Sequence, residues 1–298
     1  MRHSGRHSGA KWPIDELGRE SALSAMLASH GAALDAVASA QGEIDEAAGQ
    51  IALALSTGRT LHYVAAGSSA LMALADACEL PGTFGITQSQ IRICMAGGVP
   101  VDGVMPGDVE DEVDGAAKAA QAMASDDVCV AVSASGTTPY TLSFARAAKA
   151  RGNMVIAVAN VTGSPLLDLA DVAIALPTGP EVVEGSTRLG AGTAQKVALN
   201  MLSTQAGILL GHVHSGFMVN LVADNIKLRK RASRIVAQVA GVTENAADTA
   251  LRASSFDTKL AVLVASGVDM DVARQRLEKA DGHLRKCLSD HAQNENNL

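Results

Sequence analysis

Five short apolar runs alternate with helical segments through the middle of the chain, and this alternation limits the fold more than any other feature of the sequence. Each run is bounded by turn residues, and most runs are separated by stretches with helical spacing. That pattern is typical of parallel strands covered by helices on both faces. We therefore expect an α/β protein with a doubly wound, five-stranded parallel sheet between two helical layers, of the flavodoxin or Rossmann type. The expected strands lie at 60–66, 90–95, 127–132, 154–159 and 172–176.

Length and local composition divide the chain into three parts. The 298 residues suffice for one substantial core and a smaller appendage. Residues 1–16, rich in Gly, His, Ser and Arg, are expected to be a disordered leader. Residues 17–216 would hold two amino-terminal helices, the sheet and a long apolar helix over 186–210. Residues 217–298 would form a small helical domain similar to a ubiquitin-associated unit, with helices over 218–234, 244–252, 258–265 and 269–280.

Charge and hydropathy exclude several classes of partner. A net charge of -7 argues against nucleic acid, because binding to a phosphate backbone requires a basic surface. No apolar run reaches the ~20 residues that cross a bilayer, and the amino terminus lacks the apolar core of a signal peptide. We therefore expect a cytoplasmic protein with no membrane partner. The four cysteines lack CxxC spacing, and no metal site is expected.

Hydroxyl-rich turns follow two of the expected strands. Residues 133–138 place four hydroxyls and a glycine behind the third strand, and residues 67–69 follow the first. Either turn alone could be an ordinary helix N-cap. Two such turns at the carboxyl ends of strands are the arrangement in which open α/β sheets bind anions. We predict a phosphate clamp of Ser133, Ser135, Gly136, Thr137 and Thr138, with Gly67, Ser68 and Ser69 opposite it.

Longer runs around these turns resemble a known family. The stretches 134–140, 181–188 and 191–196 are similar to the sugar isomerase (SIS) domain and, within that superfamily, to the N-acetylmuramic acid 6-phosphate etherases. The similarity extends from about Gly58 to the carboxyl terminus. It implies cleavage of the D-lactyl ether of N-acetylmuramic acid 6-phosphate, giving N-acetylglucosamine 6-phosphate and D-lactate. It also implies that the partner is a phosphorylated amino sugar and that no cofactor takes part.

Two glutamates match the catalytic positions of this family. An ether oxygen is a poor leaving group, so elimination needs one group that protonates this oxygen and another that removes the proton from sugar C2. Glu79 is the candidate acid, kept protonated by partial burial, although it could instead be a helix-end residue before Pro81. Glu110 is the candidate base, with Asp111 and Glu112 as rivals in the same acidic run.

The resemblance assigns three more residues to substrate binding: Glu181, Ser186 and Lys196. Glu181 could instead be a loop acid that caps the following helix. The chain also departs from the family pattern, because Leu71 and Thr137 stand where the etherases carry arginines. Their loss removes planar bidentate donors that a threonine cannot replace, which bears on the etherase reaction, whereas phosphosugar binding is still expected.

Two alternative functions stay open, since a fold does not fix a function. An aldose-ketose isomerase of the same fold would use one glutamate as base, and Glu181 permits this. A non-catalytic phosphosugar sensor resembling the glucokinase regulatory protein would suit the missing arginines. In either case a homodimer is expected, because the long apolar helix over 186–210 needs a partner.

Overall fold

The computed structural model describes residues 13–105 and 107–288. Two compact units are present, the first made of residues up to 77 together with 89–203, and the second of 78–88 together with 204 onward. The expected domain boundary at 217 therefore falls inside the second unit. Within the expected leader, Ile14–Glu16 form a 3-10 helix, and the leader residues 1–12 lie outside the described part of the chain.

A five-stranded parallel sheet forms the centre of the first unit, which confirms the expected fold class. Its strands are β1 (Leu61–Ala65), β2 (Ile91–Met95), β3 (Val128–Ser133), β4 (Met154–Ala159) and β5 (Val172–Ala175). They lie in the order β2-β1-β3-β4-β5, the flavodoxin-like order, whose switch point falls between β1 and β3. The carboxyl ends of β1 and β3 are in register, with Ala65 opposite Val132.

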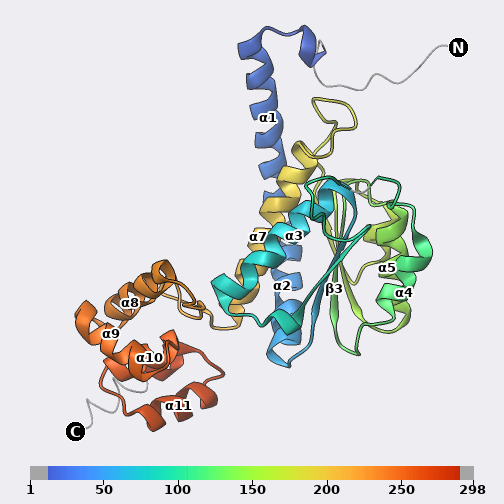
Figure 1. The fold of residues 1–298 in the computed structure, drawn as a ribbon. Coiled ribbons are helices and arrows are strands. Elements are labelled where there is room, and N and C mark those ends of the chain that lie inside the picture. Colours follow the sequence, from blue (N-terminus) through green and yellow to red (C-terminus); the bar gives the residue numbers. More distant parts are fainter. Residues whose placement is uncertain (1–12, 106, 289–298) are drawn as a thin grey trace, which may run out of the picture. The chain divides into compact units, whose positions relative to one another are not determined.

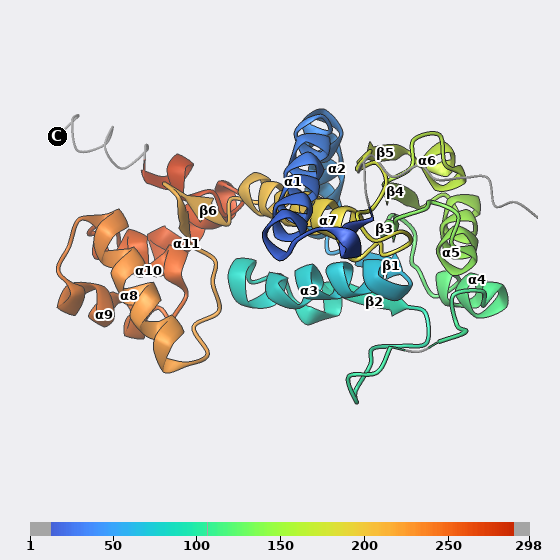
Figure 2. The same cartoon turned by 90° about the horizontal axis from the view of Figure 1, so that it is seen from above.

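Helices cover both faces of this sheet (Figures 1 and 2). The shorter helices α4 and α5 lie on one face, whereas α2, the start of α3 and the start of α7 lie on the other. Their bounds are α1 (Arg19–Ala38), α2 (Gln41–Ser56), α3 (Gly67–Phe84), α4 (Val113–Ala120), α5 (Pro139–Ala150), α6 (Pro165–Leu169) and α7 (Gly190–Leu209), and a 3-10 helix spans Gln88–Gln90.

Small side chains let these layers approach each other closely. Side chains alternate between the two faces of a strand, so Val64 and Ala131 pack against Phe144 of α5 in one buried cluster. Tyr63, the neighbour of Val64, instead reaches α3 on the opposite face. Aromatic residues make up only 2% of the chain, and Tyr63 and Phe144 are the two aromatic residues among the largest fully buried side chains of the described residues.

The long helix α7 begins four residues later than the sequence predicts. Helical spacing suggested a start at Ser186, but this residue lies in a turn that is closed by its N–H on the carbonyl of Val183 at 3.0 Å. The helix starts at Gly190 because the carboxylate of Glu181, nine residues earlier in the chain, accepts the N–H groups of Gly190 and Ala191. Local sequence spacing does not reveal such a contact.

The second unit contains a helical cluster with its own apolar core. Its helices are α8 (Ile226–Ala240), α9 (Glu244–Ala253), α10 (Thr258–Ala265) and α11 (Met270–Lys279). The last three agree with the sequence prediction, whereas the helix predicted from 218 is wrong at its start. Residues there form a hairpin of β6 (Val213–His214) and β7 (Phe217–Met218), and α8 begins later because Asn225 caps it by accepting the Leu228 N–H.

None of the helices in the described ranges combines the length and the apolar character that a membrane span requires.

Candidate functional site

The turn between β3 and α5 holds a connected set of hydroxyl contacts at the carboxyl end of the sheet. Ser133 is buried, and its Oγ accepts the Gly136 N–H at 3.0 Å and lies 2.8 Å from Thr138 Oγ1. The Oγ of Ser135 accepts the backbone N–H of Thr137 at 3.1 Å and its hydroxyl at 2.9 Å. The structure thus brings all four hydroxyls of the predicted clamp into one turn.

Gly136 fixes the path of this turn. Its φ of 66° lies in the left-handed region, where glycine is favoured. A Cβ at this position would also lie only 2.1 Å from the Oγ of Ser164, the residue before α6. Since the Leu166 N–H donates to the Gly136 carbonyl at 3.1 Å, the turn is held tightly against the start of α6.

The start of α5 adds a favourable field for an anion. Pro139 occupies the first turn, where its missing N–H leaves no unsatisfied donor. The positive end of the helix dipole faces the carboxyl ends of the strands, beside the hydroxyls. Thr138 and the helix start therefore offer both hydrogen bonds and partial positive charge to a phosphate.

The second predicted turn lies beside the first, because β1 and β3 are neighbours. Helix α3 begins at Gly67, and the Oγ of Ser68 lies 3.2 Å from Oγ1 of Thr187 in the loop before α7. Ser69 is buried, so only Ser68 of the pair is half-exposed on this turn. The sequence did not single out Thr187, although it belongs to the 181–188 stretch that carries the family resemblance.

The carboxylate of Glu110 lies against the start of α3. A Cβ on Gly67 would be 2.4 Å from Glu110 Oε1, so a glycine with φ of 55° makes room for this oxygen. The Glu110 backbone carbonyl accepts the N–H of Tyr140, in the first turn of α5, at 2.9 Å. Glu110 therefore contacts the beginnings of both helices that follow the two hydroxyl turns.

The rivals of Glu110 are directed differently. The Glu112 carboxylate folds over the first turn of α4, where a Cβ on Gly115 would lie 2.4 Å from its Oε1. Asp111 is exposed and has no hydrogen bond or ion pair among the contacts of the described residues. Of the three candidate carboxyls, Glu110 has the contact with the hydroxyl turns.

Glu79 is not partly buried as expected. It is exposed on α3, twelve residues beyond Gly67. At 1.5 Å per residue, twelve residues correspond to about 18 Å of helix. Pro81 lies inside this helix without ending it, and α3 runs on to Phe84. Glu79 therefore lies about 18 Å along α3 from Gly67, the residue that contacts the Glu110 carboxylate.

Glu181 is engaged as a helix cap. Its Oε2 accepts the Gly190 N–H at 2.8 Å and its Oε1 accepts the Ala191 N–H at 2.9 Å, so both oxygens stabilise the start of α7. The structure thus matches the alternative reading of Glu181 as a capping acid. Ser186 lies in the turn that precedes this helix.

A buried hydrogen-bond network connects β1, α3 and α7. Asp76 is 4% exposed; its Oδ2 accepts the Tyr63 hydroxyl at 2.7 Å, and its Oδ1 accepts Asn200 Nδ2 and Ser203 Oγ, both at 2.9 Å. The Lys196 ammonium donates to Asn200 Oδ1. Desolvation by burial raises the pKa of Asp76, and the three donors and the Lys196 charge oppose this rise. The sequence prediction missed Asp76, although a carboxyl in the apolar stretch 71–77 was a usable signal.

A groove of about 620 Å³ runs from the clamp along α4 and α5. Its lining includes Thr137 of the clamp together with Val113 and Leu142. Arg146 is the one charged residue of the lining, so a guanidinium lies in the same groove as Thr137, the position at which the family arginine is missing.

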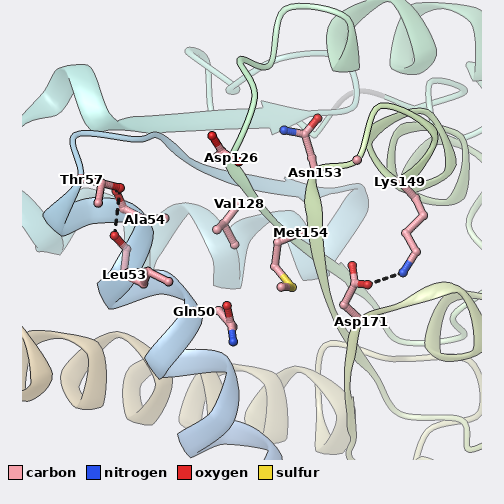
Figure 3. A pocket seen from close by; sticks show the side chains of 11 residues that line it. Gln50, Leu53, Ala54, Thr57, Asp126, Val128, Lys149, Asn153, Met154 and Asp171 are labelled. Atoms are coloured by element: carbon pink, nitrogen blue, oxygen red, sulfur yellow. Dashed lines mark hydrogen bonds and ion pairs between the residues drawn. The ribbon is translucent and has the colours of Figure 1, made fainter.

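A second cavity, of about 330 Å³, lies at the amino ends of the strands, opposite the hydroxyl turns (Figure 3). Val128 and Met154, the first residues of β3 and β4, line it, and Lys149 pairs with Asp171 on its wall. Because ligands of open α/β sheets bind at the carboxyl ends of strands, this cavity is not the predicted phosphosugar site.

In the part of the chain that the structure describes, no three side chains of His, Cys, Asp or Glu gather as metal ligands would.

Comparison with known proteins identifies the family. The SIS domain family matches residues 103–205. An N-acetylmuramic acid 6-phosphate etherase of Mesorhizobium japonicum is 41% identical over 251 residues, covering 83% of this chain and 82% of that protein. The chain belongs to the N-acetylmuramic acid 6-phosphate etherase family. A further etherase, of Deinococcus radiodurans, is 38% identical over 280 residues, covering 93% of this chain and 92% of that protein.

Membership of the etherase family confirms the resemblance drawn from the hydroxyl turns and the stretches around them. Among solved structures, a phosphoheptose isomerase from Francisella tularensis is 18% identical, with a TM-score of 0.46 over 63% of this chain and 97% of that one. A likeness at this level bears on neither the reaction nor the substrate of this etherase-family chain.

Proposed function

We propose that this protein cleaves the D-lactyl ether of N-acetylmuramic acid 6-phosphate, releasing D-lactate and N-acetylglucosamine 6-phosphate. The observation that carries the proposal is the contact of the Glu110 carboxylate with Gly67, between the two hydroxyl turns. The hydroxyls of Ser133, Ser135, Thr137 and Thr138 and the start of α5 would bind the phosphate, with Ser68 beside them. A carboxylate next to such a clamp lies within reach of the bound sugar.

The reaction needs two proton transfers. Glu110 removes the proton from sugar C2, the electron pair forms the C2–C3 double bond, and the C3–O bond to the lactyl group breaks. Glu79 donates a proton to the departing lactyl oxygen. Water then adds back across the double bond, with its hydroxyl on C3 and a proton on C2, which gives the product sugar.

The position of Glu79 leads us to propose a homodimer in which Glu79 of the partner subunit completes the site. Two observations support this proposal. Within one chain about 18 Å of helix separates Gly67, beside Glu110, from Glu79. In addition, α1 exposes leucines at helical spacing, with Leu23, Leu27 and Leu34 exposed to 65%, 73% and 51%. An unpartnered apolar stripe of this kind is typical of a subunit contact.

The decisive experiment for the activity is the release of D-lactate from N-acetylmuramic acid 6-phosphate, followed with a D-lactate dehydrogenase. Wild type should release one D-lactate per sugar, and the unphosphorylated sugar should be a poor substrate because it lacks the group that the clamp binds. If no D-lactate forms while phosphosugars still raise the melting temperature, the etherase proposal is wrong and the sensor alternative takes its place.

The shared site has its own test by mixing inactive variants. Glu79→Ala and Glu110→Ala homodimers should each be inactive, but a heterodimer of the two would contain one site with both glutamates. Random exchange of subunits should therefore restore about a quarter of the wild-type rate. If the two glutamates act within one chain, the mixture stays inactive, and light scattering that shows a monomer contradicts the dimer directly.

The isomerase alternative loses its main support, because the oxygens of Glu181 are both occupied by N–H groups of α7. The cytoplasmic location expected from the sequence is kept as part of the proposal.

A further inference from the structure

Asp76 makes contacts that go beyond holding the fold together. It is a buried carboxylate with no direct ion pair to any described residue, and its three donors, on Tyr63, Asn200 and Ser203, are neutral. A buried charge needs compensation, and here the nearest cation whose charge acts on Asp76 is Lys196, one side chain away through Asn200. Asp76, Asn200 and Lys196 thus form a chain of two hydrogen bonds, called the relay below, in which the Asn200 amide joins the carboxylate to the ammonium.

The amide of Asn200 can satisfy this relay in one orientation only. Its NH₂ end must face the Asp76 carboxylate, because a carboxylate only accepts hydrogen bonds. Its oxygen must face the Lys196 ammonium, because an ammonium only donates. The negative charge of Asp76 therefore decides which end of the amide Lys196 meets.

The stripe on α7 that makes these contacts is continuous. Lys196, Asn200 and Ser203 stand at positions i, i+4 and i+7, which lie on one face of a helix. Asn200 and Ser203 both contact Asp76 on α3, while the ammonium of Lys196 stays exposed. The same two helices begin at Gly67 and Gly190, next to the Ser68 and Thr187 hydroxyl contact. Lys196 thus belongs to the helix that borders the hydroxyl turn of residues 67–69.

We propose that Asp76 is a positioning residue for the phosphosugar site: through Asn200 it holds the Lys196 ammonium in one place on α7, where it contributes to binding of the anionic ligand. The inference rests on the proposed function, because Lys196 is a ligand-binding residue only if this is a phosphosugar site. An amide in place of the Asp76 carboxylate would let the Asn200 side chain turn over and present its NH₂ to Lys196. The ammonium would then leave its position although the fold remains.

A double-mutant cycle tests the relay, with N-acetylglucosamine 6-phosphate as the probe and calorimetric titration as the measurement. Lys196→Ala should weaken binding about 10- to 100-fold, the loss typical of a charged hydrogen bond. Asp76→Asn should weaken binding several-fold when Lys196 is present and not at all in the Lys196→Ala background, because both changes act through one ammonium. In steady-state kinetics Asp76→Asn should raise KM and leave kcat unchanged.

Ser203→Ala is the matched control, since it removes a donor from the same carboxylate without touching the Asn200 side chain; the Ser203 hydroxyl also contacts the Asn200 backbone carbonyl, at 3.4 Å. It should lower the melting temperature yet change the affinity less than twofold. The inference would be overturned if the affinity losses of the two single variants multiply in the double variant. It would also be overturned if Asp76→Asn leaves the affinity unchanged. If Asp76→Asn fails to fold, the same cycle is run with Asn200→Ala in its place. Affinity losses of Asn200→Ala and Lys196→Ala that multiply in the double variant would again overturn the inference.

The binding readout separates this inference from the proposed reaction. If wild type binds the probe but releases no D-lactate, the etherase proposal fails while the cycle still decides the role of Asp76. If wild type does not bind the probe, both are wrong.

Discussion

Replacement of Gly67 by alanine tests whether the contact between Gly67 and Glu110 supports catalysis. The new Cβ would lie 2.4 Å from Glu110 Oε1, whereas ordinary contacts begin near 3.4 Å. The carboxylate must therefore move by about 1 Å. A displacement of that size in a catalytic group can lower the rate on the order of 100-fold, and we expect kcat for D-lactate release to fall by about this factor.

The substitution also strains the backbone, and the strain must be separated from the displacement. An alanine at φ of 55° costs roughly 1–2 kcal/mol, which for a chain of this size lowers the melting temperature by about 2–4 °C per kcal/mol. Gly58→Ala is the matched control. Gly58 has φ of 77°, and a Cβ there meets nothing within 4 Å.

Both variants should therefore lose similar thermal stability, measured by differential scanning fluorimetry, while only Gly67→Ala loses kcat. Glu110→Ala sets the lower limit for the rate. Equal kcat values for Gly67→Ala and Gly58→Ala would refute the reasoning, because the position of the Glu110 carboxylate would then not matter for the reaction.

Three further predictions follow from single contacts. Glu181→Ala should destabilise the protein by about 1 kcal/mol through loss of the α7 cap, with KM unchanged, and a raised KM in a stable variant would return this residue to the substrate site. Ser133→Ala should lower both melting temperature and phosphosugar affinity, because it leaves the buried Gly136 N–H without its acceptor, at about 1–3 kcal/mol; an unchanged affinity would remove Ser133 from the clamp. Burial lowers the pKa of His212 to about 4, so between pH 6.5 and 4 the unfolded chain binds more protons than the folded one, and the free energy of unfolding should fall as the pH falls through this range. In denaturant titrations His212→Gln should make the free energy of unfolding less dependent on pH over this range, and an unchanged pH dependence would contradict the assignment.

The sequence predicted those features that depend on neighbours along the chain. Buried strands read as apolar runs, and the hydroxyls of residues 133–138 had to emerge together because they follow one strand directly. By contrast, the start of α7 depends on Glu181, which reaches Gly190 across a loop, and α3 continues past Pro81, a residue that by itself predicts a helix end. Periodicity contains neither piece of information.

The same limit applies to the candidate site. Glu110 was chosen by spacing within an acidic run, and its contact with Gly67 joins residues that are far apart in the sequence. Asp76 was visible as a carboxyl in an apolar helix, but its partners on β1 and α7 could not be known before the helices were packed. Family resemblance located Glu79, whereas only the structure showed that α3 carries it twelve residues beyond Gly67.

The hydroxyl contacts within residues 133–138 also determine how the turn can bind a ligand. Ser135 and Thr137 are bonded to each other, and so are Ser133 and Thr138, so the turn keeps its shape without help from a ligand. An incoming phosphate must exchange these bonds for its own, and such an exchange contributes little net enthalpy. Affinity should therefore come mainly from charge and from a small loss of conformational entropy on binding. A turn of this kind discriminates by charge, and it should bind the phosphate dianion in preference to the monoanion, so that ligand affinity rises as the pH passes the second pKa of the phosphate, about 6.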